Sequence, residues 1–120
     1  MKPYQDARVE GEKLAKQYAE LEKADQVDFY NGLEGYYSVL GHNKKQEAIA
    51  VLIEKNDHKI YVYQLDKGIS QDKAATISRE KGASDIDKVT FGRYQDKTIW
   101  EVKSGNQYYL VDFETGAVIQ

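Results

Sequence analysis

The sequence contains no cysteine and only two histidines. The absence of cysteine excludes disulfides, thiolate nucleophiles and zinc sites with cysteine ligands. The histidines, His42 and His58, fall at expected strand ends or turns, and their spacing from neighbouring carboxylates matches no known ligand pattern. We therefore interpret both as surface turn residues and expect neither a metal site nor a cofactor.

Long apolar runs are also missing. The longest extends from Ala48 to Ile53, between two glutamates, whereas a helix that spans a bilayer needs roughly twenty apolar residues. The first residues, Met1-Lys2-Pro3-Tyr4, do not read as a secretory signal. The sequence thus predicts no membrane span of its own, and an anchor that preceded this start stays open as an alternative.

The charge balance argues against a nucleic-acid partner. The formal net charge is −3 and the isoelectric point is near 5.4, whereas phosphate binding needs a basic face. The densest basic cluster, Lys44-Lys45, is typical of a solvated turn. With 41% hydrophobic and 31% charged residues, the 120-residue chain has the composition of one globular domain or of two very small ones.

The first half of the chain predicts a helix followed by four strands. Residues 4–24 carry apolar residues at alternating steps of four and three, which is typical of an amphipathic helix. From Asp25 the period changes to two, and polar turns separate four short apolar segments that end near Leu65. The apolar positions of the predicted helix are Ala7, Gly11, Leu14, Tyr18 and Leu21.

The second half repeats this order. Ser70 predicts a helix N-cap, and Lys81-Gly82 predicts the end of the same helix. Four strands are expected near residues 88–94, 98–103, 107–113 and 117–119. We interpret the chain as an internal duplication with units at residues 1–66 and 67–120. The expected core is Val27, Phe29, Tyr37, Val39, Val89, Phe91, Trp100, Val102, Val111 and Phe113.

Four sequence segments carry a resemblance to a known family. They are Tyr36-Tyr37-Ser38-Val39, residues 68–74 (GISQDKA), Trp100-Glu101-Val102, and residues 109–116 (YLVDFETG). In these segments the chain resembles the YpmB-like proteins of Gram-positive bacteria, whose soluble part is a tandem of cystatin-like units related to the PepSY domain. The resemblance implies an α+β fold of two tandem cystatin-like αββββ units, the second of them PepSY-like.

The resemblance also implies a location and a role. It implies an N-terminal single-span anchor, absent from this chain, with the domain on the extracytoplasmic side of the cell membrane. PepSY-type domains are thought to restrain or regulate peptidases and wall hydrolases, so the expected partner is an envelope protein or peptide. The family offers no established catalytic residues to carry over.

Individual residues do not predict catalysis. Ser38 lies in an expected strand and Ser70 has a helix to cap, and neither stands in a Gly-x-Ser-x-Gly motif. Glu101 is the carboxylate to watch, because it lies between Trp100 and Val102. Alternation along a strand places it on the face opposite to both, so we expect it in a solvated outer position.

Tyrosine is the one compositional anomaly, with ten Tyr against three Phe and one Trp. If Tyr37 faces the helix, alternation sends Tyr36 to the opposite face, and Tyr61 and Tyr63 follow if Ile60 and Val62 point inward. The outer face of a sheet covered on one side should be polar, so an aromatic one needs a covering. Either another part of the protein or a second copy packs there, or Tyr36, Tyr61 and Tyr63 bind a partner.

Two classes of function remain open at this point. The first is a non-catalytic interaction module that binds a peptide, a wall polymer or an envelope enzyme. The second is a small enzyme or ligand-binding protein that uses a pocket on the concave sheet face. An ionisable cluster with shifted pKa values on that face would favour the second. The residues expected there are mainly Val, Ile and aromatic side chains, which favours the first.

Overall fold

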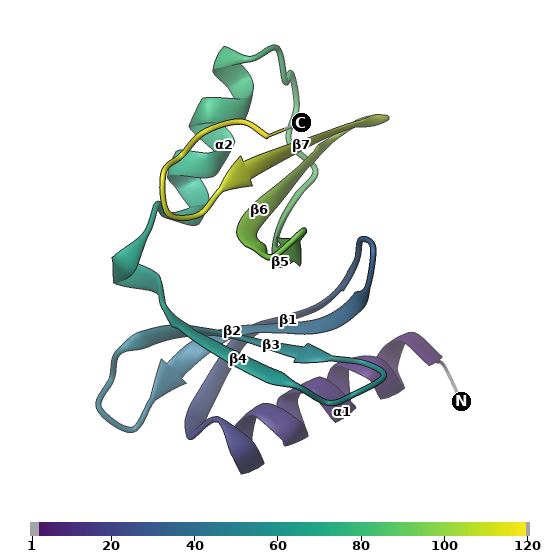
Figure 1. Cartoon of the computed structure of the whole chain (residues 1–120), viewed down its shortest axis with the longest axis vertical. Coiled ribbons are helices and arrows are strands. Elements are labelled where there is room, and N and C mark those ends of the chain that lie inside the picture. The colour runs from purple at the N-terminus through teal and green to yellow at the C-terminus, as the bar shows by residue number, and fades with distance from the viewer. Residues whose placement is uncertain (1–2, 120) are drawn as a thin grey trace. The chain divides into compact units, whose positions relative to one another are not determined.

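The computed structural model describes residues 3–119 of the chain (Figure 1). Met1 and Lys2, at the start discussed above, lie outside the described residues. The chain divides into two compact units, residues 1–65 and 66–120. Each contains one α-helix and one antiparallel sheet, so the α+β class is confirmed. The assignment of the two units to cystatin-like and PepSY-like folds stays a prediction.

The first unit is a helix on a four-stranded meander with strand order β1-β2-β3-β4. Helix α1 lies across one face of this sheet (Figure 1). Its buried side lies so close to the strands that a Cβ added at Gly11 would stand only 3.1 Å from the Cβ of Tyr37. The elements are α1 Pro3–Tyr18, β1 Leu21–Asn31, β2 Gly35–Asn43, β3 Ala48–Glu54 and β4 Ile60–Gln64.

The helix ends earlier than predicted. It stops at Tyr18, and Leu21 already pairs with Asn43 as part of β1. The reason is local, because Glu20 adopts a left-handed conformation with φ of 58°, which no helix can continue. Leu21, predicted as a buried position of a longer helix, is buried in the core as the first residue of β1 instead. Tyr18, expected on the buried side, is exposed, and the side chain of Ala7 is not among those described.

The second unit is a helix on a three-stranded sheet with order β5-β6-β7. A short 3-10 turn, η1 (Leu65–Lys67), precedes it. As predicted, the Ser70 hydroxyl caps the helix by accepting a hydrogen bond from the backbone N–H of Lys73 at 3.0 Å. The elements are α2 Gln71–Glu80, β5 Lys88–Tyr94, β6 Lys97–Ser104 and β7 Gln107–Asp112.

The predicted fourth strand of this unit, residues 117–119, is wrong. The Asp112 carboxylate accepts hydrogen bonds from the N–H groups of Glu114 and Thr115, which closes a tight turn after β7. The returning segment then makes only an isolated bridge, Val118 to Val111. The second unit is therefore a helix with three strands, and the two units are not identical in their strand number.

The two units nevertheless share their cross-strand core pairs. Phe29 lies opposite Tyr37 with the ring centroids 5.6 Å apart, and Phe91 lies opposite Trp100 at 4.9 Å, both edge to face. Val27 opposite Val39 corresponds to Val89 opposite Val102. Most of the predicted core is buried, and Phe29 and Val89 are partly exposed.

Candidate docking face on the first sheet

The two faces of the first sheet carry different side chains. The face that contacts α1 carries the aliphatic core, with Ile49, Val51 and Ile53 from β3 all at 2% exposure or less. Registered pairs place the tyrosines on the other face. The members of this tyrosine face, from β1 to β4, are Asp28, Tyr30, Tyr36, Ser38, Leu40, Ala50, Leu52, Glu54, Tyr61 and Tyr63.

The register brings the three predicted binding residues to one side of the sheet. Leu52 lies opposite both Ser38 and Tyr61, and Ala50 lies opposite Tyr63, so Tyr61 and Tyr63 share the face of Tyr36. The rings of Tyr36 and Tyr61 meet edge to face with centroids 6.4 Å apart. The predicted alternation is therefore confirmed, while a binding role for these residues is a separate matter.

Tyr30 extends this aromatic row on β1, with its ring centroid 6.5 Å from that of Tyr36. The sequence analysis missed it as part of the face, although its position next to Phe29 in an alternating strand was sufficient to place it there. Tyr30 and Tyr36 are 2% and 3% exposed, whereas Tyr61 and Tyr63 are half-buried. The accessible part of the tyrosine face is consequently its β4 margin.

One end of this face is acidic. The Tyr36 hydroxyl donates a hydrogen bond to Glu34 Oε2 at 3.2 Å. Burial raises the pKa of the Glu54 carboxyl above its ordinary value, and the nearby charges of Glu34 and Asp57 raise it further, while the positive charge of Lys59 offsets part of this rise. A cationic group of a partner would relieve this repulsion.

The remaining candidate residues do not converge. His42 Nδ1 pairs with Asp25 Oδ2 at 2.8 Å at the edge of the first sheet, and His58 occupies a turn with φ of 57°. Ser38 is buried within β2. Among the described side chains, no three from His, Asp or Glu are grouped as a metal site requires. Glu101 faces away from Trp100 as expected, but it is half-buried, not fully solvated, and burial raises the pKa of its carboxyl.

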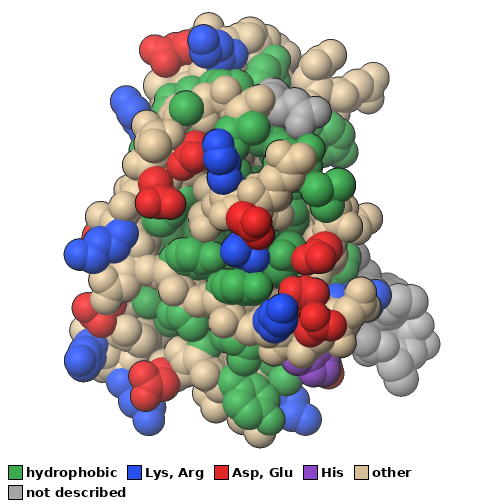
Figure 2. Space-filling model, in the orientation of Figure 1, with side chains coloured by type: hydrophobic (Ala, Val, Ile, Leu, Met, Phe, Trp, Pro, Cys, Tyr) green, Lys and Arg blue, Asp and Glu red, His purple; other side chains and the backbone are tan. Residues whose placement is uncertain are grey.

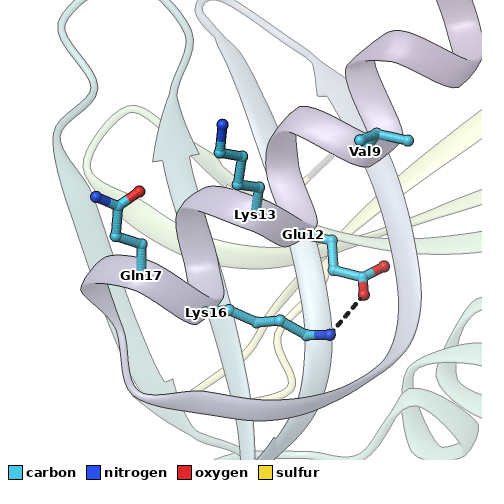
Figure 3. Close-up of a pocket in the computed structure, with 5 residues that line it drawn as sticks. All are labelled: Val9, Glu12, Lys13, Lys16 and Gln17. Atoms are coloured by element: carbon cyan, nitrogen blue, oxygen red, sulfur yellow. Dashed lines mark ion pairs between the residues drawn. The ribbon is translucent and has the colours of Figure 1, made fainter.

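Two surface hollows lie away from the tyrosine face. The larger, about 580 Å³, runs along the solvent side of α1 and is lined by Val9, Lys13 and the ion pair of Glu12 with Lys16 at 2.9 Å (Figure 3). A second, about 270 Å³, lies beside His42 and Asn43. Neither contains a convergent set of catalytic groups. The first is typical of the solvated side of an amphipathic helix.

Acidic and basic side chains are interspersed over the surface that Figure 2 shows. The face shown there offers no broad basic patch to a nucleic acid, in keeping with the net charge of −3. Among the described residues, no helix has the length and apolar character needed to cross a bilayer.

Comparisons with known proteins agree with one another. A family model described as the cell wall elongation regulator TseB-like domain matches residues 10–54, which include Tyr36 but not Tyr61 and Tyr63. The protein described as probable cell wall elongation regulator TseB, from Bacillus subtilis (strain 168), is 38% identical over 114 residues, an alignment that covers 88% of this chain and 70% of that protein.

A solved structure supports the same relationship. The structure described as YpmB protein from Bacillus subtilis aligns with a TM-score of 0.76 and 33% identity, covering 100% of this chain and 96% of that one. The resemblance to YpmB-like proteins, first seen in short sequence segments, is thereby confirmed along the whole chain. The chain belongs to the TseB-like family.

Proposed function

We propose that this protein is a non-catalytic regulatory domain that acts at the bacterial cell envelope by binding another envelope protein or peptide. The relative from Bacillus subtilis is described as a probable cell wall elongation regulator, which supports a regulatory role connected with the cell wall. The bound partner is a wall hydrolase or a peptidase in this proposal. The domain acts on the extracytoplasmic side, held there by an N-terminal membrane span.

The observation that carries the proposal is the tyrosine face of the first sheet. Tyr61 and Tyr63 are half-buried on the last strand, and the Tyr36 ring contacts the Tyr61 ring edge to face. Tyrosine combines a large apolar body with a polar hydroxyl and loses little conformational entropy on binding, so it is enriched at protein interfaces. The acidic end formed by Glu34, Glu54 and Asp57 adds a preference for a basic residue in the partner.

A pair of matched double variants tests this role. In the Tyr61→Ser/Tyr63→Ser variant we expect the envelope partner to be lost while the melting temperature stays within a few degrees of the wild type. In the control, Tyr18→Ser/Tyr108→Ser, the same chemistry is removed at two sites that are 61% and 53% exposed and lie off this face. The control should keep the partner.

The assay uses the full-length, membrane-anchored protein. Cross-linking in intact cells, followed by affinity purification, identifies the proteins captured by each variant. Restoration of normal cell length in a strain that lacks the protein provides an independent readout. An unchanged set of partners in the Tyr61→Ser/Tyr63→Ser variant, or a large loss of stability in it, would show that these tyrosines are structural and that binding occurs elsewhere.

A further inference from the structure

The four sheet edges of the described chain differ in how they are protected. An exposed strand edge offers unpaired backbone groups to another strand, and proteins normally protect it with charges, bulges or a covering segment. The β1 edge is interrupted by two register irregularities, between Leu21 and Lys23 and between Ala24 and Gln26. The β1 edge is thus poorly suited to pairing with a second strand.

Both outer edges of the second sheet are also protected. On β5, the Gln71 side chain donates a hydrogen bond to the Val89 carbonyl at 3.0 Å. On β7, the returning segment covers the edge, since the N–H of Asp112 donates to the Ala117 carbonyl and the N–H of Ile119 donates to the Leu110 carbonyl. Only the fourth edge, that of β4, lacks such a device among residues 3–119.

Strand β4 has the sequence IYVYQ, with no charge, no proline and a regular register on β3. The first sheet ends at β4, and no described strand pairs with its outer side. Four consecutive residues of high β propensity, followed by an uncharged glutamine, are typical of a strand that pairs with another chain. This edge is therefore the strongest feature of the molecule that the proposed partner surface does not already use.

Backbone alternation identifies the groups that β4 presents outward. The N–H of Glu54 donates to the Lys59 carbonyl, so Lys59 is hydrogen-bonded toward β3. In an antiparallel pair successive residues alternate between bonding toward one neighbour and away from it. The N–H and C=O groups of Ile60, Val62 and Gln64 consequently point outward from the sheet.

The central residue of this set is also apolar and exposed. Val62 lies opposite Val51 and shares its face, but Val62 is 49% exposed whereas Val51 is fully buried. The difference arises because α1 packs mainly on β1, β2 and β3, so Val62 lies at the margin of the face that the helix covers. The outward edge of β4 therefore combines backbone groups that can pair with apolar surface that pairing would cover.

We propose that β4 pairs in antiparallel orientation with β4 of a second copy of this chain, about a two-fold axis at Val62. In this register Val62 faces Val62 of the partner chain, and Ile60 faces Gln64, so every outward residue meets an outward residue. Each such pair exchanges two hydrogen bonds, which gives on the order of six between the chains. The two four-stranded sheets become one continuous sheet.

The strand itself favours a second copy over another occupant. The sequence of β4 reads Tyr-Val-Tyr in both directions about Val62. In the antiparallel dimer Tyr61 of one chain therefore lies opposite Tyr63 of the other, which makes an aromatic cross-strand pair. The charges at its ends are complementary too, since Lys59 precedes β4 and Asp66 follows it. The antiparallel two-fold brings Lys59 of one chain toward Asp66 of the other. An interface of this length is small, so the dimer is weak and reversible.

A single engineered cysteine tests the register, because the chain has none of its own. Facing residues in a hydrogen-bonded pair have Cα atoms about 5.5 Å apart, within the range for a disulfide. Under mild oxidation the Val62→Cys variant should form a covalent dimer. Leu33→Cys, at a position that is 68% exposed at the tip of the β1–β2 hairpin, is the matched control. We expect the Val62→Cys variant to cross-link at least tenfold faster.

A second pair of variants tests the hydrogen bonds. Val62→Pro removes an N–H that points away from β3, so the ladder to β3 is kept while pairing between chains is blocked. Val62→Thr keeps the N–H and is the control. By sedimentation at rising concentration up to about 1 mM, the wild type and Val62→Thr should increase in mass above 13.7 kDa toward twice that value, and Val62→Pro should not.

Two results would overturn the proposal: a wild type that stays monomeric at the highest concentration, or equal cross-linking rates for the two cysteine variants. If Val62→Pro fails to fold, as far-ultraviolet circular dichroism would reveal, the cysteine pair still decides the question. The hydrogen bonds of the dimer come from the backbone of β4, to which the Tyr61–Tyr63 pair adds, whereas the proposed partner surface depends on the tyrosine side chains alone, which Val62→Pro keeps. Loss of the dimer in Val62→Pro with an unchanged set of captured envelope proteins separates the two proposals.

Discussion

Trp100 anchors the second unit, and its replacement by phenylalanine is the most informative single test of the core. The side chain is 1% exposed, and its indole N–H donates a hydrogen bond to the Ile69 carbonyl at 3.0 Å. The ring also meets Phe91 and Phe113 edge to face, with centroids 4.9 Å and 6.4 Å away. Phenylalanine keeps part of this aromatic packing and removes the donor.

The expected loss has two parts. The Ile69 carbonyl loses its partner in a buried place, which costs about 1–3 kcal/mol. The smaller ring leaves a cavity and loses buried area, which costs about 1–2 kcal/mol more. The free energy of unfolding should fall by about 2–5 kcal/mol, equivalent to a melting temperature lower by roughly 10–20 °C for a chain of this size.

Urea unfolding followed by far-ultraviolet circular dichroism measures this change without relying on tryptophan fluorescence. Tyr108→Phe is the control, because Tyr108 lies in the same sheet and is 53% exposed, so its effect should stay within about 0.5 kcal/mol. A loss below about 1 kcal/mol in Trp100→Phe would refute the reasoning. It would mean that neither the Ile69 bond nor the ring volume contributes to stability.

Two further predictions concern a glycine and a carboxylate. A Cβ at Gly41 would collide with the Lys23 carbonyl at the irregular β1–β2 pairing, so Gly41→Ala should lower the free energy of unfolding by about 2 kcal/mol or more. The control is Gly105→Ala, where the added Cβ meets nothing within 4 Å and only the φ of 61° is unfavourable. This control should lose less unfolding free energy. Burial raises the pKa of the Glu101 carboxyl above its ordinary 4.5, so the folded state favours the protonated form and stability falls as pH rises through the window above 4.5. Glu101→Gln should therefore be more stable than the wild type at pH 7, and the difference should vanish below about pH 4. Urea unfolding at a series of pH values measures this difference. The control, Glu114→Gln at an exposed turn, should show no such trend.

Much of the fold follows from periodicity and from turn chemistry. The change from helical to alternating spacing, seen twice, predicted both helices and seven of the eight strands near their observed positions. Ser70 identified the start of α2 because its hydroxyl can accept a hydrogen bond from an N–H of the first helical turn that has no partner within the helix. Alternation also separated Tyr36 from Tyr37 and Glu101 from Trp100 correctly, because a strand sends successive side chains to opposite faces.

The end of α1 could not be read from the same signals. Leu21 satisfies both a helical face and the first buried position of β1, so its spacing does not distinguish the two structures. The deciding event is the left-handed conformation of Glu20, an uncommon choice for a residue other than glycine. Likewise, residues 117–119 have the composition of a strand, but the Asp112 turn leaves them only one bridge to β7.

Alternation assigns a side chain to a face without stating how much of it remains accessible, and this distinction decides where the candidate site lies. Tyr36, Tyr61 and Tyr63 are equivalent in the sequence pattern, yet Tyr36 is 3% exposed and the other two are half-buried. Alternation also does not predict the exposure of Val62. It assigns Val62 to the same face as the buried Val51, but α1 leaves Val62 uncovered. On the face that α1 covers, exposure depends on the width of the sheet relative to the helix, and a strand at the edge of a four-stranded sheet extends past a single helix. The tyrosines lie on the opposite face, so α1 does not set their exposure. Both the proposed partner surface and the proposed dimer contact therefore fall on β4.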